Sequence, residues 1–292
     1  MSNRDKIKRY RELIKSELAP LIDSDYALLD VPNHPNIGDN LIWEGELQFL
    51  KELPYKCIYS ANVHNWDEEK IKDVKIILFH GGGNWGDLYR ECQEHRLYIT
   101  EKFPNKRIIV FPQTVWYNNM DLLPNDSKLF NSHNDIHICV RDQASMNLLS
   151  NYIDIEKLHL LPDMAFFVEI NKNTIKRAGE KTLFMLRTDS EVGNISLQNF
   201  SDFDVKDWPT FSTNKYLAYL LAYYSFYKVQ LSRKLQHVKI LSQIVNPMYG
   251  LNNRNNRIRY IQKGIDFFSN YDIIYTTRLH GLILGILMEK KM

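Results

Sequence analysis

The sequence predicts an α/β protein with two domains, each built on a parallel sheet. Apolar runs of strand length, such as residues 74–80 and 107–113, alternate with segments whose apolar residues recur at helical spacing. This alternation is typical of parallel sheets that helices cover on both faces. The chain has 292 residues, of which 44% are hydrophobic and 25% are charged, so it is long and apolar enough to form two cores.

Residues 1–170 are predicted to form an N-terminal Rossmann-like domain. Its expected strands are residues 26–31, 57–60, 74–80, 107–113 and 135–142, and the apolar segment 158–167 ends the series. Its expected helices are residues 40–53, 90–103 and 143–152. Because open parallel sheets bind ligands at the carboxyl ends of their strands, the residues that follow each strand are the candidates for a functional site.

Residues 171–292 are predicted to form a second Rossmann-like domain, which follows a polar linker at residues 169–182. Its expected strands are residues 182–187, 238–245 and 272–278, and its expected helices are residues 214–236 and 253–269. Two such domains with parallel sheets facing a central cleft have a GT-B-like architecture. The final helix is expected to be still running at the last residue, so we expect a shortened C-terminus that lacks one strand and a closing helix.

The composition excludes several classes of function. The net charge is +2, whereas domains that bind nucleic acid usually carry a clear basic excess. The three cysteines form no CxxC pair, which argues against a disulfide framework or a zinc site, and we expect no metal or other cofactor. The N-terminus lacks the apolar region of a secretory signal, and no apolar run reaches the ~18 residues of a membrane span. We therefore expect a cytoplasmic enzyme.

A helix expected at residues 215–235 is crowded with tyrosines and also carries basic residues. The favoured interpretation is a helix packed in the second domain with its tyrosine hydroxyls at the rim. The alternative is a peripheral contact with the inner face of the plasma membrane, because aromatic and basic residues together are typical of membrane surfaces.

The glycine-rich segment HGGGNWGD, residues 80–87, directly follows an expected strand. Three successive glycines let backbone N–H groups approach a ligand closely, as in nests that bind anions. No GK[ST] follows, so the segment is not a Walker A motif. We favour a binding role over a plain strand-to-helix turn, and His80, Asn84 and Asp87 would then line the cleft.

A second candidate segment, NIGDN at residues 36–40, lies between an expected strand and helix. Gly38 allows a tight turn, and either Asp39 or Asn40 is a suitable N-cap for the helix. Asp39 has a second interpretation as a contact to substrate, and the sequence favours neither.

Arg141 is predicted to lie at the end of a strand, with Asp142 positioned to cap the next helix. An arginine there suits bidentate binding of a phosphate or carboxylate. The alternative is a surface ion pair between Arg141 and Asp142. Asp163 also follows an expected strand and is interpreted as a turn residue.

The segment TTRLHG, residues 276–281, runs from an expected strand into an apolar helix. Arg278 and His280 would point to the same side if the strand persisted through them. Both would then lie near a helix N-terminus, where an anion is favoured. A histidine in that position is a plausible proton donor or acceptor near neutral pH.

Taken in order, the segments NIGDN, ILFHGGGNWGDLY, IIVFPQTV, VRDQAS, LLPDMAF and TTRLHG resemble the polysaccharide pyruvyl transferase family, over about residues 26–288. The resemblance implies a GT-B-like fold. It also implies transfer of an enolpyruvyl-derived group from phosphoenolpyruvate to a hexose, which forms a pyruvate ketal during the synthesis of bacterial cell-surface polysaccharide. The expected acceptor is galactose or a related sugar, often linked to a polyprenyl lipid.

The resemblance also implies roles for individual residues. Its donor-binding positions match Arg141, Arg278, Leu279 and His280. We hypothesise that the two arginines bind the donor and that His280 is the general acid. The acceptor is expected at the edge of the first domain's cleft, near Asp39, His80, Asn84 and Asp87.

Two other functions remain open on the sequence alone. A GT-B glycosyltransferase that uses a nucleotide sugar would also have glycine-rich loops in its first domain and a basic second domain. A non-catalytic protein of the same fold that binds carbohydrate or phosphate is the second alternative, although the presence of Arg141, Arg278 and His280 argues against it.

Overall fold

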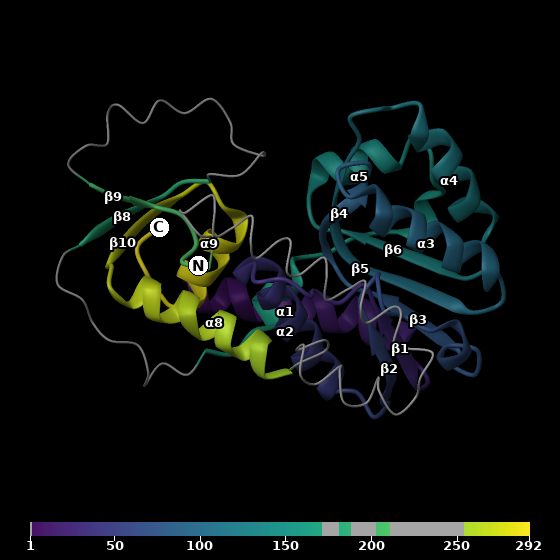
Figure 1. The fold of residues 1–292 in the computed structure, drawn as a ribbon, viewed down its shortest axis with the longest axis horizontal. Coiled ribbons are helices and arrows are strands. Elements are labelled where there is room, and N and C mark those ends of the chain that lie inside the picture. The colour runs from purple at the N-terminus through teal and green to yellow at the C-terminus, as the bar shows by residue number, and fades with distance from the viewer. Residues whose placement is uncertain (1, 171–180, 188–202, 211–253) are drawn as a thin grey trace. The chain divides into compact units, whose positions relative to one another are not determined.

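A computed structural model of the chain describes residues 2–170, 181–187, 203–210 and 254–292 (Figure 1). The chain forms two units, and each is described by itself. Unit 1 comprises Met1–Ile7, His34–Glu44 and Val168–Met292, and unit 2 comprises Lys8–Asn33 and Gly45–Phe167. The predicted domain boundary at residue 170 and the central cleft stay predictions.

Unit 2 is built on a seven-stranded sheet in which every pair of neighbouring strands is parallel. The strands are β1 (Tyr26–Leu29), β2 (Cys57–Ala61), β3 (Ile76–Phe79), β4 (Gly82–Gly86), β5 (Arg107–Trp116), β6 (Ile136–Val140) and β7 (Leu158–Leu160). Their order is β2-β1-β3-β5-β6-β7, and β4 pairs with the second half of β5. The predicted α/β class with parallel sheets is therefore confirmed.

Helices cover both faces of this sheet. The helices that carry residues of unit 2 are α1 (Asn3–Leu18), α2 (Ile37–Lys51), α3 (Arg90–Lys102), α4 (Leu122–Ser132) and α5 (Gln143–Leu149), and the first two also carry residues of unit 1. Figure 1 shows α3, α4 and α5 together on one side of the strands. There, alternate strand residues such as Ile77, Phe79 and Val110 join Ile99 and Phe130 of the helices in one core. The intervening strand residues are also buried, and Phe111 packs edge-on against Phe49 of α2. Burial on both faces explains why these strands are continuous apolar runs.

Most of the glycine-rich segment is a strand, so the alternative of a plain strand-to-helix turn is wrong, and its predicted binding role stays a prediction. Gly82 and Gly86 pair with Gln113 and Trp116 of β5. Gly86 has a φ of +112°, and a Cβ on it would overlap the carbonyl oxygen of Trp116. A Cβ on Gly81 would also lie 2.8 Å from the carbonyl oxygen of Pro112. Glycine at both ends of this segment therefore allows a close approach to the neighbouring strand.

Unit 1 contains a three-stranded parallel sheet in the order β10-β8-β9. Its strands are β8 (Thr182–Met185), β9 (Asp204–Lys206) and β10 (Ile273–Thr276). Among the described residues, the helices that belong to unit 1 alone are α8 (Arg254–Ser269) and α9 (Leu279–Leu287). Leu183 and Ile274 of the sheet are buried, as are Phe268 of α8 and Ile283 of α9. This strand–helix–strand order agrees with the sequence prediction for residues 182–187, 253–269 and 272–278.

The segment 158–167 contains the strand β7, which ends at Leu160, and a 3-10 helix at Met164–Phe167. One expectation about the chain's path is wrong. The last helix ends at Leu287 rather than running to the last residue, and Lys291 then forms an isolated parallel bridge with Ile273. The expected linker at 169–182 falls mostly outside the described residues, as do the expected helix at 214–236 and strand at 238–245.

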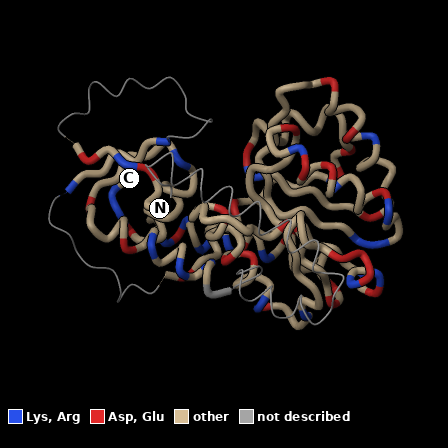
Figure 2. The backbone as a smooth tube through the Cα atoms, in the orientation of Figure 1, with Lys and Arg blue, Asp and Glu red and all other residues tan. Residues whose placement is uncertain are grey.

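Charged residues of both signs are interspersed along the described chain (Figure 2), in keeping with the net charge of +2. Within the described residues, none of the helices is long and apolar enough to cross a membrane. The tyrosine-rich segment at 215–235 is outside that part of the chain.

Candidate functional site

Arg278 lies between β10 and α9 in unit 1, at the N-cap position of the helix. The strand ends at Thr276, whose hydroxyl oxygen accepts a hydrogen bond of 3.0 Å from the Arg278 backbone N–H. Leu279 and His280 are already the first two residues of α9. The expectation that Arg278 and His280 share one face of a persisting strand is therefore wrong, although both do lie at a helix N-terminus.

A carboxylate that the sequence did not reveal holds the Arg278 side chain. Arg278 is 6% exposed, and its guanidinium makes a two-point contact with Asp207. Its Nη2 donates to Oδ2 of Asp207 at 2.6 Å, and its Nε donates to Oδ1. Asp207 directly follows β9, so this pairing fixes the plane and direction of the guanidinium from the far edge of the three-stranded sheet.

His280 packs against Gly38, which lies at the N-terminus of α2. A Cβ added to Gly38 would lie 2.6 Å from Nδ1 and 2.9 Å from Cγ of His280, so only glycine fits beneath the imidazole. Both helices, α2 and α9, thus begin beside His280, and His280 remains partly exposed. Backbone N–H groups and positive dipole ends at helix N-termini favour a bound anion.

The start of α2 is held in place by its own residues and by α8. Asn36, rather than Asp39 or Asn40, caps the helix, because its Oδ1 accepts from the Gly38 N–H at 2.9 Å. Asn40 instead donates its side-chain amide to the carbonyl oxygens of His34 and Asn36. Asp39 is 3.6 Å from Nε2 of His34, and its side chain is 27% exposed.

A buried arginine of α8 supports the same part of α2. Arg257 is 3% exposed; it donates to Oε2 of Glu44 at 2.7 Å and lies over the ring of Trp43. A Cβ on Gly264 would lie 2.9 Å from Ile37, so the two helices touch closely. Gly38 is therefore presented to His280 by a firmly packed helix.

Arg141 of unit 2 lies directly after β6 and is also held by a carboxylate. Its Nη1 donates to Oδ2 of Asp163 at 2.6 Å, and its Nε donates to the hydroxyl of Thr114 at 2.9 Å. Its side chain is 9% exposed, so the alternative of a surface pair with Asp142 is wrong. Asp142 is the predicted N-cap of α5 and accepts from the Ser145 N–H at 2.8 Å. Asp163 is not only a turn residue, because its carboxylate accepts hydrogen bonds both from Arg141 and from the backbone N–H of Ala165.

His80 and Asn84 lie in a polar network inside unit 2. His80 is 3% exposed, and its Nδ1 is 2.8 Å from Oε2 of the fully buried Glu46. Asn84 accepts hydrogen bonds through its Oδ1 from Arg96 at 2.7 Å and from Gln113 at 2.9 Å. These contacts hold the glycine-rich strand to its neighbours, and the predicted position of both side chains at a cleft edge stays a prediction.

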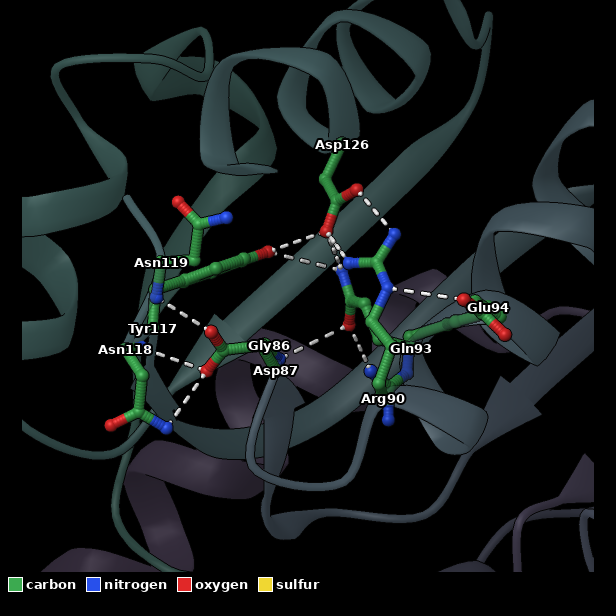
Figure 3. Close-up of polar contacts among 10 residues, drawn as sticks. Gly86, Asp87, Arg90, Gln93, Glu94, Tyr117, Asn118, Asn119 and Asp126 are labelled. Carbon is green, nitrogen blue, oxygen red and sulfur yellow. Dashed lines mark hydrogen bonds and ion pairs between the residues drawn. The ribbon is translucent and has the colours of Figure 1, made fainter. Parts of the chain in front are cut away.

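Asp87 joins two loops at the carboxyl ends of β4 and β5. Its carboxylate accepts from the backbone N–H groups of Asn118 and Asn119, both at 2.7 Å (Figure 3). Desolvation would raise the pKa of Asp87. The hydrogen bonds from Asn118, Asn119 and its own backbone N–H, together with the positive charge of Arg90, outweigh desolvation and hold the pKa below its ordinary value. Asp87 is therefore a structural anchor for both loops.

The family model for polysaccharide pyruvyl transferases matches residues 36–292, which is most of the chain. The chain belongs to the polysaccharide pyruvyl transferase family. The resemblance predicted from the six ordered segments is thus confirmed, and the protein is a transferase of the pyruvyl transferase class in polysaccharide biosynthesis. This assignment does not favour the nucleotide-sugar glycosyltransferase.

Two similar proteins agree with this family assignment, and one solved structure has a similar fold. It is 31% identical over 291 residues to EpsO of Bacillus subtilis, a protein provisionally named a pyruvyl transferase, and the match covers 95% of this chain and 84% of EpsO. It is 28% identical over 276 residues to pyruvyl transferase 1 of Schizosaccharomyces pombe, with 90% of this chain and 63% of that protein covered. The fold is similar to the crystal structure of an uncharacterized protein from Klebsiella pneumoniae, at a TM-score of 0.53 and 20% identity over 97% of this chain and 86% of that one.

Within unit 1 of the transferase, two segments far apart in the sequence meet: Gly38 of the NIGDN segment lies against His280 of the TTRLHG segment. Arg278, two residues before His280, pairs with Asp207. Unit 2 separately holds Arg141 with Thr114 and Asp163. In the described stretches of the chain, no group of three or more His, Cys, Asp or Glu side chains is arranged to hold a metal ion.

Proposed function

We propose that this transferase moves the enolpyruvyl-derived group of phosphoenolpyruvate onto two hydroxyls of a hexose and forms a pyruvate ketal. The observation that carries the proposal is the setting of His280. An imidazole that can donate a proton lies beside the N-termini of two helices, and the residue two before it is a buried arginine. Such a setting favours a small, multiply charged anion together with proton transfer, and phosphoenolpyruvate requires both.

In this proposal Arg278 contacts an anionic group of the donor. Asp207 keeps the guanidinium oriented before the donor arrives, so little side-chain freedom is lost on binding. Arg141, which Asp163 and Thr114 orient in the same manner, is the second donor arginine. Leu279, 45% exposed at the first turn of α9, lines the donor site through its apolar side chain.

The proposed reaction has two steps. The protonated imidazole of His280 delivers its proton to the methylene carbon of phosphoenolpyruvate, which becomes a methyl group, while one sugar hydroxyl forms a bond to C2. The second hydroxyl then attacks C2 as the bond to phosphate breaks, and inorganic phosphate leaves. The two hydroxyl protons are released, one of which restores His280. The products are the ketal and phosphate, so the scheme needs no redox partner.

The proposed acceptor is galactose or a related hexose, carried on a growing polysaccharide that is linked to a polyprenyl lipid. Asp39 is our candidate for a contact to an acceptor hydroxyl, because it adjoins Gly38 and its side chain is 27% exposed. We assign supporting rather than direct roles to His80, Asn84 and Asp87, because their side chains hold neighbouring segments of unit 2 together through hydrogen bonds with Glu46, Arg96 and Asn118.

Donor binding distinguishes this proposal from a sugar-nucleotide enzyme. We expect phosphoenolpyruvate to raise the Tm of the protein, because a ligand that binds the folded state alone must stabilise it, and we expect UDP-glucose to have no effect. In Arg278→Lys, the cation can still pair with Asp207 but the planar fork is lost, so the phosphoenolpyruvate concentration that gives half the Tm shift should rise about tenfold or more. Arg107→Lys, at a partly exposed arginine of β5, is the control and should behave as wild type. A Tm shift with UDP-glucose alone would contradict the proposal.

A further inference from the structure

Large apolar side chains are exposed on the two loops that Asp87 joins. Trp116 is 56% exposed at the end of β5, and Met120, in the same loop, is 44% exposed. Leu88 and Tyr89 follow Asp87 in the loop after β4 and are 38% and 51% exposed. Exposed aromatic and aliphatic side chains concentrated on neighbouring loops are typical of a binding surface.

Hydrogen bonds join these two loops, although several of their apolar side chains are exposed. The Asp87 N–H donates to the carbonyl oxygen of Trp116 at 3.2 Å, and the Asp87 carboxylate accepts from Asn118 and Asn119 (Figure 3). The indole Nε1 of Trp116 donates to Oδ1 of Asn118 at 3.0 Å, which orients the ring. An aromatic ring that is both exposed and oriented is prepared to receive a ligand without a loss of side-chain freedom.

Trp116 lies on the same face of β5 as the residue that holds Arg141. Successive side chains of a strand alternate between faces, so Thr114 and Trp116 share a face while Val115 is buried on the other. Thr114 accepts the hydrogen bond from Nε of Arg141. At about 3.3 Å per residue, the two positions are separated by about 7 Å along the strand. One hexose ring fits within that distance.

We propose that Trp116 is the stacking platform for the hexose ring of the acceptor. This inference rests on the proposed function, in which Arg141 binds the donor whose C2 must meet two hydroxyls of the same sugar. A hexose presents an apolar face of C–H groups and a polar rim, which matches an indole ring bordered by the side chain of Asn118. An exposed aromatic surface can also bind an anionic lipid bilayer. The neighbouring acidic residues Asp87 and Asp121 disfavour that alternative, because they would repel the anionic lipids.

The experiment measures sugar binding and turnover in Trp116→Ala and Trp116→Phe. The probes are the methyl glycosides of galactose, glucose, mannose and N-acetylmannosamine, whose aglycone has no aromatic ring. Saturation-transfer NMR on the full chain without donor reports binding directly, and phosphate release with phosphoenolpyruvate gives KM and kcat. Tyr152→Ala, which removes a 37% exposed aromatic ring after α5, is the matched control.

We expect Trp116→Ala to raise the acceptor KM about tenfold, which corresponds to about 1.4 kcal/mol. Its kcat should stay within about twofold of wild type, since the ring makes the same contact before and during reaction. Saturation of the sugar ring protons should be lost in Trp116→Ala, retained in Trp116→Phe and unchanged in Tyr152→Ala.

Either of two results would overturn the proposal that Trp116 is a stacking platform. In the first, Trp116→Ala shows the same saturation of the sugar protons and the same acceptor KM as the wild type. In the second, the wild type shows no saturation transfer to any of the four glycosides. Loss of binding to phosphatidylethanolamine–phosphatidylglycerol vesicles in Trp116→Ala, with sugar binding intact, would assign the surface to a membrane instead. Sugar saturation that depends on Trp116, with no phosphate released from phosphoenolpyruvate, would support the platform while contradicting the proposed function.

Discussion

Replacing His280 with alanine is expected to lower kcat by about 10²–10⁴-fold, the range that a general acid typically contributes. His280 is partly exposed at the first turn of α9, so the truncation removes little buried surface. The protein should therefore stay folded and keep its affinity for phosphoenolpyruvate. Phosphate release under saturating donor measures the rate, and the Tm with and without phosphoenolpyruvate measures folding and binding.

The control is His64→Ala, because His64 is another partly exposed histidine, which contacts Glu91 in unit 2. This variant should turn over at the wild-type rate. If His280→Ala retains more than about a tenth of wild-type kcat, a loss well below the usual contribution of a general acid, the assignment of His280 as the acid is wrong.

Replacing Gly38 with alanine is expected to lower kcat by about 10²-fold although the new methyl group touches no ligand. The added Cβ would lie 2.6 Å from Nδ1 of His280, so the imidazole must move by a large part of an ångström. A displacement of about 1 Å at a catalytic group can cost about 10²-fold in rate. Alanine is the better helix former, so local helix propensity should not weaken α2. The measurement is kcat together with the Tm.

A double-mutant cycle separates this steric effect on His280 from an independent effect of Gly38. In the His280→Ala background the imidazole is gone and the methyl group has room, so adding Gly38→Ala should change kcat by less than about twofold. Additive losses in the double variant would show that Gly38 acts through something other than the position of His280.

Strands made of consecutive apolar residues could be predicted from the sequence, because such residues must be buried. Residues 76–79 lie within the predicted strand 74–80 because four consecutive apolar residues require burial on both faces. The strand Gly82–Gly86 could not be predicted, since GGNWG has little strand propensity and its pairing depends on close approach to β5. The short strand Asp204–Lys206 is exposed and polar, and its pairing with β8 carries no sequence signal.

The sequence predicted which residue types lie at the candidate site, but it did not predict which residues they contact. Arg278 and His280 do lie where a strand gives way to a helix, as the residue pattern indicates. The carboxylates that hold the arginines, Asp207 and Asp163, come from distant segments and are paired by tertiary packing. The contact between Gly38 and His280 likewise joins opposite ends of the chain, so the turn glycine of the sequence is in fact a packing requirement.

The most direct test of the central claim is the reaction itself, run in deuterium oxide with phosphoenolpyruvate and the four methyl hexosides and followed by mass spectrometry. We expect a pyruvate ketal on at least one hexoside, with one deuterium in its methyl group and one phosphate released per ketal, and ketal formation about 10²–10⁴-fold slower with His280→Ala. A wild-type protein that forms no ketal on any of these sugars, or a ketal whose methyl group carries no solvent deuterium, would contradict it.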